Sequence, residues 1–92
     1  PKVIQVEIPK EGTLAWLRQQ ANQDNPEAQT ELGLKYWSGI ELEQDRFKAY
    51  EWFDKAALLN YPPAQYHLAK MFLEGDNVLQ DTTKALELLR AA

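Results

Sequence analysis

Apolar residues from position 9 onwards recur at intervals of three and four, which places them on one face of an α-helix. One such stripe is formed by Ala28, Leu32 and Tyr36. Prolines, glycines and asparagines interrupt the pattern at intervals, so it predicts about five helices rather than one long helix. The predicted helices cover residues 9–23, 26–38, 46–59, 62–74 and 82–92. The loops between them are short, which is typical of antiparallel neighbours.

The predicted helix ends carry the residues that helix ends favour. Asn25, Asp45 and Asp81 each precede a helix as N-cap candidates. Gly39 and Gly75 each follow a helix, where a residue of positive φ is most needed. Residues 9–12 are a weaker start, because Pro9 suits a first turn but Gly12 disfavours it.

The helical pattern occurs twice with a constant offset of 36 residues. Residues 28–56 align with residues 64–92 without a gap, and 10 of the 29 positions are identical. The identical pairs are Ala28/Ala64, Gln29/Gln65, Leu32/Leu68, Gly39/Gly75, Gln44/Gln80, Asp45/Asp81, Lys48/Lys84, Ala49/Ala85, Glu51/Glu87 and Ala56/Ala92. A period of this length is typical of a repeat array, in which one unit cannot bury its apolar face alone. The sequence therefore predicts an all-α solenoid.

The same offset assigns the rest of the chain. Trp16 aligns with Trp52 and Leu17 with Phe53, so residues 9–24 are interpreted as the second half of an earlier repeat. We expect an extended leader over 1–8 and one domain over 9–92, made of half-repeat 9–24, repeat 25–60 and repeat 61–92. The apolar stripe of the last helix stops at Ala92, so we expect an array that is cut at both ends.

Small and large apolar residues have distinct predicted roles in the stacking of helices. The alanines at 28, 49, 56, 64 and 85 let helix axes approach closely, while Tyr36 and Trp52 fill the space between helix pairs. In the last helix Ala85, Leu88 and Leu89 are the apolar set.

Residues 1–8 follow a different pattern, because Ile4, Val6 and Ile8 alternate with polar residues as in a half-buried strand. The backbone groups of a lone strand need partners. One interpretation is an extended leader whose apolar residues lie against the first helix, and this is the one we expect. The other is an edge over Val3–Ile8 that pairs with a second copy or with another chain.

Composition narrows the function classes. The 92 residues suit one small domain, and a net charge of −4 without a Lys/Arg cluster argues against nucleic acid and anionic membranes. The absence of cysteine excludes disulfides and thiolate metal sites. No apolar run approaches the ~20 residues of a membrane-spanning helix, so we expect a soluble protein without membrane insertion.

Two groups of ionisable residues were considered for chemistry. His67 is the one histidine, and it has no companion ligand at helical spacing. Glu41, Glu43 and Asp45 form only a loose approximation to a calcium loop. We therefore expect no catalytic residue, no metal and no cofactor.

The repeat resembles a known family. The residues that carry the likeness in the first unit are Ala28, Leu32, Gly33, Tyr36, Gly39, Asp45, Lys48, Ala49, Trp52, Lys55, Ala56 and Ala57; those in the second are Ala64, Leu68, Phe72, Gly75, Asp81, Lys84, Ala85, Ala91 and Ala92. Their spacing resembles the Sel1-like repeat, a relative of the tetratricopeptide repeat. The resemblance implies a right-handed α/α superhelix that serves as an adaptor or scaffold, commonly in bacteria, and it does not imply catalysis. It leaves open a cytoplasmic or a periplasmic location.

The second unit departs from the family pattern at three positions. Ala69 stands in place of the glycine at Gly33, Asp76 in place of an apolar residue, and Leu88 in place of the tryptophan. The cysteine pairs of some members of the family are absent. We expect the second unit to pack less tightly or to have a more variable loop.

A partner-binding surface is predicted on the first helix of each pair, because these helices line the concave side of such arrays. The predicted partner-binding residues are Glu27, Thr30, Glu31, Leu34, Trp37, Tyr66, His67, Lys70, Leu73 and Glu74. Leu34 and Trp37 lie off the core stripe and, with Tyr66, resemble an interface anchor set. The alternative is that Trp37 packs on the next helix pair or on the leader. The glutamates of this face favour a neutral or basic partner segment.

The functional prediction is a non-catalytic protein–protein interaction module that binds a partner segment on its concave face. Trp37→Ala should weaken partner binding by ~1–3 kcal/mol and leave the fold intact. Two alternatives stay open at this point: a structural component that forms homo-oligomers through the solenoid ends or the N-terminal strand, and, more remotely, a small enzyme.

Overall fold

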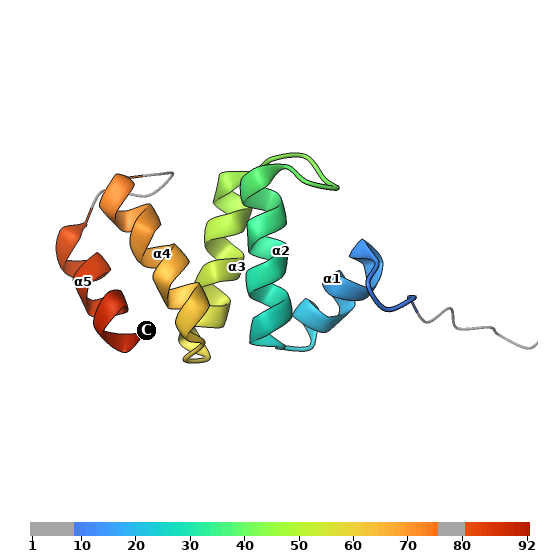
Figure 1. The fold of residues 1–92 in the computed structure, drawn as a ribbon, viewed down its shortest axis with the longest axis horizontal. Coiled ribbons are helices and arrows are strands. Elements are labelled where there is room, and N and C mark those ends of the chain that lie inside the picture. The colour runs from blue at the N-terminus through green and yellow to red at the C-terminus, as the bar shows by residue number, and fades with distance from the viewer. Residues whose placement is uncertain (1–8, 76–80) are drawn as a thin grey trace, which may run out of the picture.

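The computed structural model describes residues 9–75 and 81–92, which form five α-helices that follow one another along the molecule (Figure 1). They are α1 (Leu14–Asn22), α2 (Pro26–Ser38), α3 (Arg46–Leu58), α4 (Pro62–Glu74) and α5 (Thr82–Ala91). Each helix packs against the next, and α2 also contacts α4. Within the described ranges there is no strand, so the predicted all-α class is confirmed. The predicted leader over residues 1–8 and the departure at Asp76 lie outside the described residues.

Three side chains cap the N-termini of helices as predicted. The Asn25 Oδ1 atom accepts hydrogen bonds from the backbone N–H groups of Glu27 and Ala28, at 3.1 and 3.2 Å. Asp45 and Asp81 each accept one from the N–H group three residues later, at 3.1 and 2.9 Å. These bonds satisfy backbone donors that the helix itself leaves free, so they fix where α2, α3 and α5 begin.

The turns after the helices repeat as well. Gly39 and Gly75 follow α2 and α4 with φ values of 73° and 67°, and their N–H groups bond to the carbonyls of Lys35 and Met71. Glycine adopts this left-handed conformation without a steric cost, as the sequence predicted.

The predicted first helix is too long at its N-terminus. The helix begins at Leu14 rather than Pro9, because Gly12 has a φ of 89° and Thr13 becomes the N-cap. The Thr13 hydroxyl donates to the Lys10 carbonyl at 2.6 Å and accepts from the N–H group of Trp16 at 3.2 Å. Residues 9–13 therefore form a turn that leads into α1.

The core consists of two clusters that meet near Tyr36. One joins α1 to α2 and contains Leu17, Ala21, Ala28 and Leu32. The other joins α3 to α4 and contains Ala49, Phe53, Ala56, Ala57, Ala64, Leu68 and Met71. Tyr36 packs against both clusters, as expected of a residue that fills the space between helix pairs. Most members are alanines, which allow the close helix approach that the sequence predicted.

A buried glutamine links each helix pair to the helix before it. The Gln29 Nε2 atom donates to the Ala21 carbonyl at 3.1 Å, and the Gln65 Nε2 atom donates to the Ala57 carbonyl at 3.4 Å. Both glutamines are buried, and the two bonds are related by the 36-residue offset. The repeat in the sequence is therefore also a repeat of long-range polar contacts.

Gly33 allows α2 and α3 to approach each other closely. A Cβ atom at Gly33 would lie 2.7 Å from Cε1 and 2.8 Å from Cδ1 of the Phe53 ring, which is too close for non-bonded carbons. At the equivalent positions of the second pair stand Ala69 and Leu89. A larger residue on the first helix thus coincides with a smaller one on the second.

The apolar set predicted for α5 is only partly buried. Ala85 is fully buried and Leu88 packs against the α3–α4 cluster, but Leu89 is 38% exposed. Its counterpart Phe53 is 1% exposed, because α4 lies over it. The α5 helix is the last element, so no such helix covers Leu89 in the described structure.

Candidate partner-binding face

The first helices of the two pairs, α2 and α4, are in contact, and a cleft lies on the surface they share. It has a volume of about 210 Å³ and is lined by Leu34, Trp37, Phe53, His67 and Lys70. Two of these side chains come from α2, two from α4, and Phe53 comes from α3 beneath them. Leu34 and Trp37 are three residues apart in α2, as are His67 and Lys70 in α4, and residues three apart lie on the same side of a helix.

His67 is held on an aromatic surface. Its ring stacks on Phe53 with centroids 5.2 Å apart and an interplanar angle of 20°. Tyr66 meets the same ring edge to face, with centroids 5.6 Å apart. Burial lowers the pKa of His67 below its usual value, and the nearby Lys70 ammonium adds to the effect. The lowered pKa favours the neutral imidazole at pH 7.

Lys70 and Trp37 lie on the opposing sides of the cleft. The Lys70 ammonium lies over the Tyr66 ring, 5.7 Å from its centroid. Trp37 is half-buried against the α3–α4 cluster, and the Arg46 guanidinium lies 4.3 Å from the centroid of its ring. Trp37 therefore packs on the core and lines the cleft at the same time.

The structure places most of the predicted partner-binding residues at the surface. Glu27, Glu31, Leu34, Tyr66, Lys70, Leu73 and Glu74 are exposed, and Trp37 and His67 are half-buried. Four of them, Leu34, Trp37, His67 and Lys70, come together in the cleft.

Thr30, unlike the other predicted partner-binding residues, does not lie at the surface. Thr30 is 5% exposed, and its hydroxyl donates to the Pro26 carbonyl within α2 at 2.8 Å. A threonine can satisfy its hydroxyl on the preceding turn of a helix, so burial carries no polar penalty here.

The sequence-based prediction also did not include Phe53 among the partner-binding residues. Phe53 is buried, yet its ring also lines the cleft. Gly33 is the residue in the sequence that could have indicated this role of Phe53. A glycine in a helix allows the facing helix to approach closely, and the Phe53 ring therefore lies against α2 near Leu34 and Trp37.

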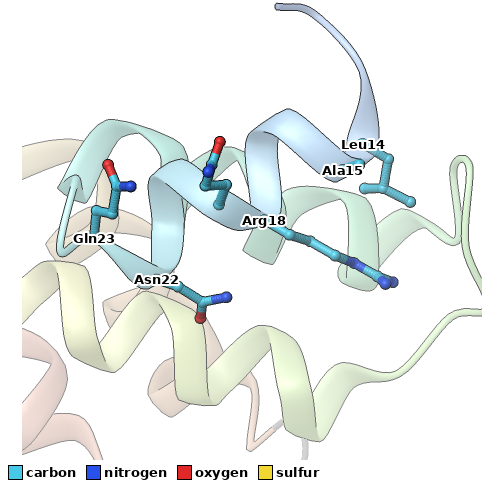
Figure 2. Close-up of a pocket in the computed structure, with 6 residues that line it drawn as sticks. Leu14, Ala15, Arg18, Asn22 and Gln23 are labelled. Atoms are coloured by element: carbon cyan, nitrogen blue, oxygen red, sulfur yellow. The ribbon is translucent and has the colours of Figure 1, made fainter. Parts of the chain in front are cut away.

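A larger hollow lies on α1, with a volume of about 630 Å³. Its lining residues are five from α1, with Gln23 at the C-cap of the same helix: Leu14, Ala15, Arg18, Gln19, Asn22 and Gln23. Figure 2 shows that Arg18, Asn22 and Gln23 point in different directions instead of converging. A binding site is typically enclosed and has a few convergent polar groups, so this open surface is the weaker candidate.

Two of the three carboxylates that loosely resemble a calcium loop have other partners. Glu41 forms an ion pair with Lys35, and Asp45 caps α3. Across residues 9–75 and 81–92, no three His, Cys, Asp or Glu side chains lie close enough together to hold a metal ion. In the same ranges, no helix combines the length and the apolar character needed to cross a bilayer.

The repeat matches a known protein family. The family model of the Sel1 repeat matches residues 26–61 and again 62–92. The chain belongs to the Sel1 repeat family. Sel1 repeats generally mediate protein–protein interaction and are generally non-catalytic.

Solved structures of Sel1 repeat proteins share the fold. A Sel1 repeat protein from Oxalobacter formigenes has a TM-score of 0.81 and 31% sequence identity over 84% of this chain. The protective antigen c5321 of uropathogenic Escherichia coli strains, which displays an SLR fold, has a TM-score of 0.81 and 36% identity over 85% of this chain. The matched region spans 59% of the first of these chains and 17% of the second.

Proposed function

We propose that this Sel1 repeat chain binds a segment of another protein in the cleft between α2 and α4 and carries out no chemistry itself. The observation that carries the proposal is the lining of the cleft, where Leu34, Trp37 and His67 from two helices meet over the Phe53 ring. The cleft is smaller than the ~300–1,000 Å³ typical of a small-molecule site, so it suits one large side chain of a partner.

Exposed apolar surface around the cleft supports a protein partner. Leu34 is 37% exposed, Tyr66 48% and Leu73 39%, and all three lie on α2 or α4. Covering apolar surface favours association, and tyrosine and tryptophan are frequent hot-spot residues. Around them, Glu27, Glu31 and Glu74 would act as a polar rim that sets orientation more than affinity.

We also propose that residues 9–24 are the second half of a further Sel1 repeat. Leu17 and Ala21 are buried like their counterparts Phe53 and Ala57. The Ala21 carbonyl accepts from a buried glutamine as the Ala57 carbonyl does. Residues 25–60 and 61–92 would then be the two repeats that follow it.

The binding proposal can be tested with peptides selected from a phage-displayed library of random dodecapeptides on the wild-type chain. Tyr66→Ala should weaken the selected peptides by ~1–3 kcal/mol, because it removes an exposed aromatic beside the cleft. Tyr66 is a sharper probe than Trp37, since Trp37 also packs on the core and its loss would lower stability. Fluorescence anisotropy on labelled peptides gives the dissociation constants.

Phe47→Ala is the matched control, because Phe47 is also an exposed aromatic but lies on α3 away from the cleft lining. It should leave the dissociation constants unchanged. Binding in the cleft would be contradicted if the library yields no enriched peptide. It would also be contradicted if Tyr66→Ala and Phe47→Ala weaken peptide binding equally.

A further inference from the structure

We propose that the cleft between α2 and α4 recognises a large apolar side chain with a carboxylate close by, as in a partner segment where Asp or Glu neighbours an apolar anchor. This inference rests on the proposed function and specifies the chemistry of the partner. It departs from the expectation of a neutral or basic segment, which considered the charges of the whole face rather than those of the cleft.

The ionisable groups that line the cleft are both bases. They are His67 and Lys70, whereas the other lining residues, Leu34, Trp37 and Phe53, are uncharged. Among the described residues, no carboxylate lies within 4 Å of the Lys70 ammonium, and the interaction it makes is with the Tyr66 ring. A carboxylate from a partner would therefore meet an ammonium group that forms no ion pair with the described residues.

The surroundings of Lys70 strengthen such a contact. Leu34, Trp37 and Phe53 exclude water from one side of the cleft, so a carboxylate there would be less screened than on an open surface. A charge-assisted hydrogen bond is shorter and about twice as strong as a neutral one. The neutral His67 ring, held flat against Phe53, can donate a second hydrogen bond from its N–H group.

The two walls of the cleft differ in charge, which gives the partner a direction. His67 and Lys70 of α4 occupy the positions that Glu31 and Leu34 occupy in α2, by the 36-residue offset. His67 and Lys70 thus line the cleft from α4, while α2 lines it with the uncharged Leu34 and Trp37. The glutamates Glu27 and Glu31 of α2 and Glu74 of α4 lie outside the lining. A carboxylate of the partner should face His67 and Lys70, and any basic residue should face the exposed glutamates outside the cleft lining.

Peptides selected on the wild-type chain from the same random dodecapeptide library test this inference. We expect Asp or Glu near a large apolar residue to be enriched over the unselected library. Lys70→Glu should weaken these peptides about tenfold or more, and selection on that variant should favour Lys or Arg instead. Circular dichroism should show an unchanged fold, because Lys70 is exposed.

Lys48→Glu is the matched control. Lys48 is exposed and lies over the ring of Tyr36 at 5.5 Å, much as Lys70 lies over Tyr66, but it does not line the cleft. Both variants change the net charge of the protein equally. If long-range electrostatic attraction alone governed binding, both would therefore lose the same affinity for the selected peptides. Equal weakening would overturn the inference, as would wild-type selection of basic peptides or of peptides without any charge preference.

The outcomes separate this inference from the proposed function. If Tyr66→Ala weakens peptide binding but Lys70→Glu does not, recognition of a carboxylate is contradicted and binding in the cleft is retained. If neither variant changes peptide affinity, both the recognition of a carboxylate and the proposed binding in the cleft are contradicted.

Discussion

The two Sel1 repeats follow one plan with different side chains. Each begins with a proline-led helix, contains a buried glutamine that reaches the preceding helix, and has an aspartate cap on its second helix. They differ where their two helices face each other, because the first repeat pairs Gly33 with Phe53 and the second has Ala69 and Leu89 at these positions. The helix caps and the glutamine contacts are common to both repeats, whereas the side chains at which the two helices of a repeat meet differ.

Position in the array adds a second difference. Phe53 is covered by α4, with the His67 ring stacked on it, whereas Leu89 is partly exposed on the last helix. The same place in the repeat therefore contributes a core residue in one copy and a surface residue in the other. Changes at these two positions should have very different effects on stability.

The largest expected effect is that of Phe53→Ala. Removing a buried phenylalanine costs about 3–5 kcal/mol of unfolding free energy, because apolar contacts are lost and a cavity stays behind. Leu89→Ala should cost roughly 1 kcal/mol or less, since the side chain is already partly in water. Urea unfolding followed by circular dichroism measures both. Similar losses in the two variants would mean that Leu89 is as well covered as Phe53.

A smaller effect is expected from Gly33→Ala. The new methyl group would meet the Phe53 ring at 2.7 Å, and relieving such overpacking costs about 1–3 kcal/mol. Adding Phe53→Leu should recover part of this loss, because the double variant reproduces the Ala69 and Leu89 combination of the second repeat.

A double-mutant cycle measures that recovery. Gly33→Ala and Phe53→Leu should show a favourable coupling of about 0.5–3 kcal/mol, as residues in contact do. Leu32→Val in place of Phe53→Leu serves as the control, because Leu32 is buried in the α1–α2 cluster and is not the residue that the new methyl group meets. Additive losses for Gly33→Ala and Phe53→Leu would contradict the size matching between the two repeats.

Most of the fold could be predicted from the sequence because its determinants are local. Asn25, Asp45 and Asp81 act as caps and Gly39 as a helix stop through atoms within a few residues. The start of the first helix was predicted wrongly, because Thr13 offered a competing cap after a glycine of positive φ.

The candidate site was predicted less completely, because it depends on contacts between helices. Periodicity placed Leu34, His67 and Lys70 on the correct helices, and the structure brings them to one cleft. It could not show that Thr30 turns its hydroxyl back onto its own helix, or that the Phe53 ring reaches the same cleft. The position of the Phe53 ring depends on how α2, α3 and α4 pack rather than on spacing.

The smallest expected effect is a change in the free energy of unfolding with pH, which we attribute to His67 of the second repeat. In the unfolded chain its pKa is about 6.5, and in the folded state burial and then Lys70 lower that pKa. Between the two values the unfolded state binds more protons, so the free energy of unfolding rises with pH. The contribution of His67 is complete above pH ~6.5 and falls as the pH drops towards the folded pKa.

His67→Gln should therefore flatten the pH dependence of the urea midpoint below pH ~6.5, because glutamine does not titrate and the ring that stacks on Phe53 is removed. Tyr66→Ala is the control for loss of an aromatic contact beside the same ring, since it leaves the imidazole in place and should keep the slope. A wild-type midpoint that rises as the pH falls from about 6.5 would contradict the lowered pKa of His67. A slope in His67→Gln as steep as in the wild type would show that His67 does not carry the pH dependence.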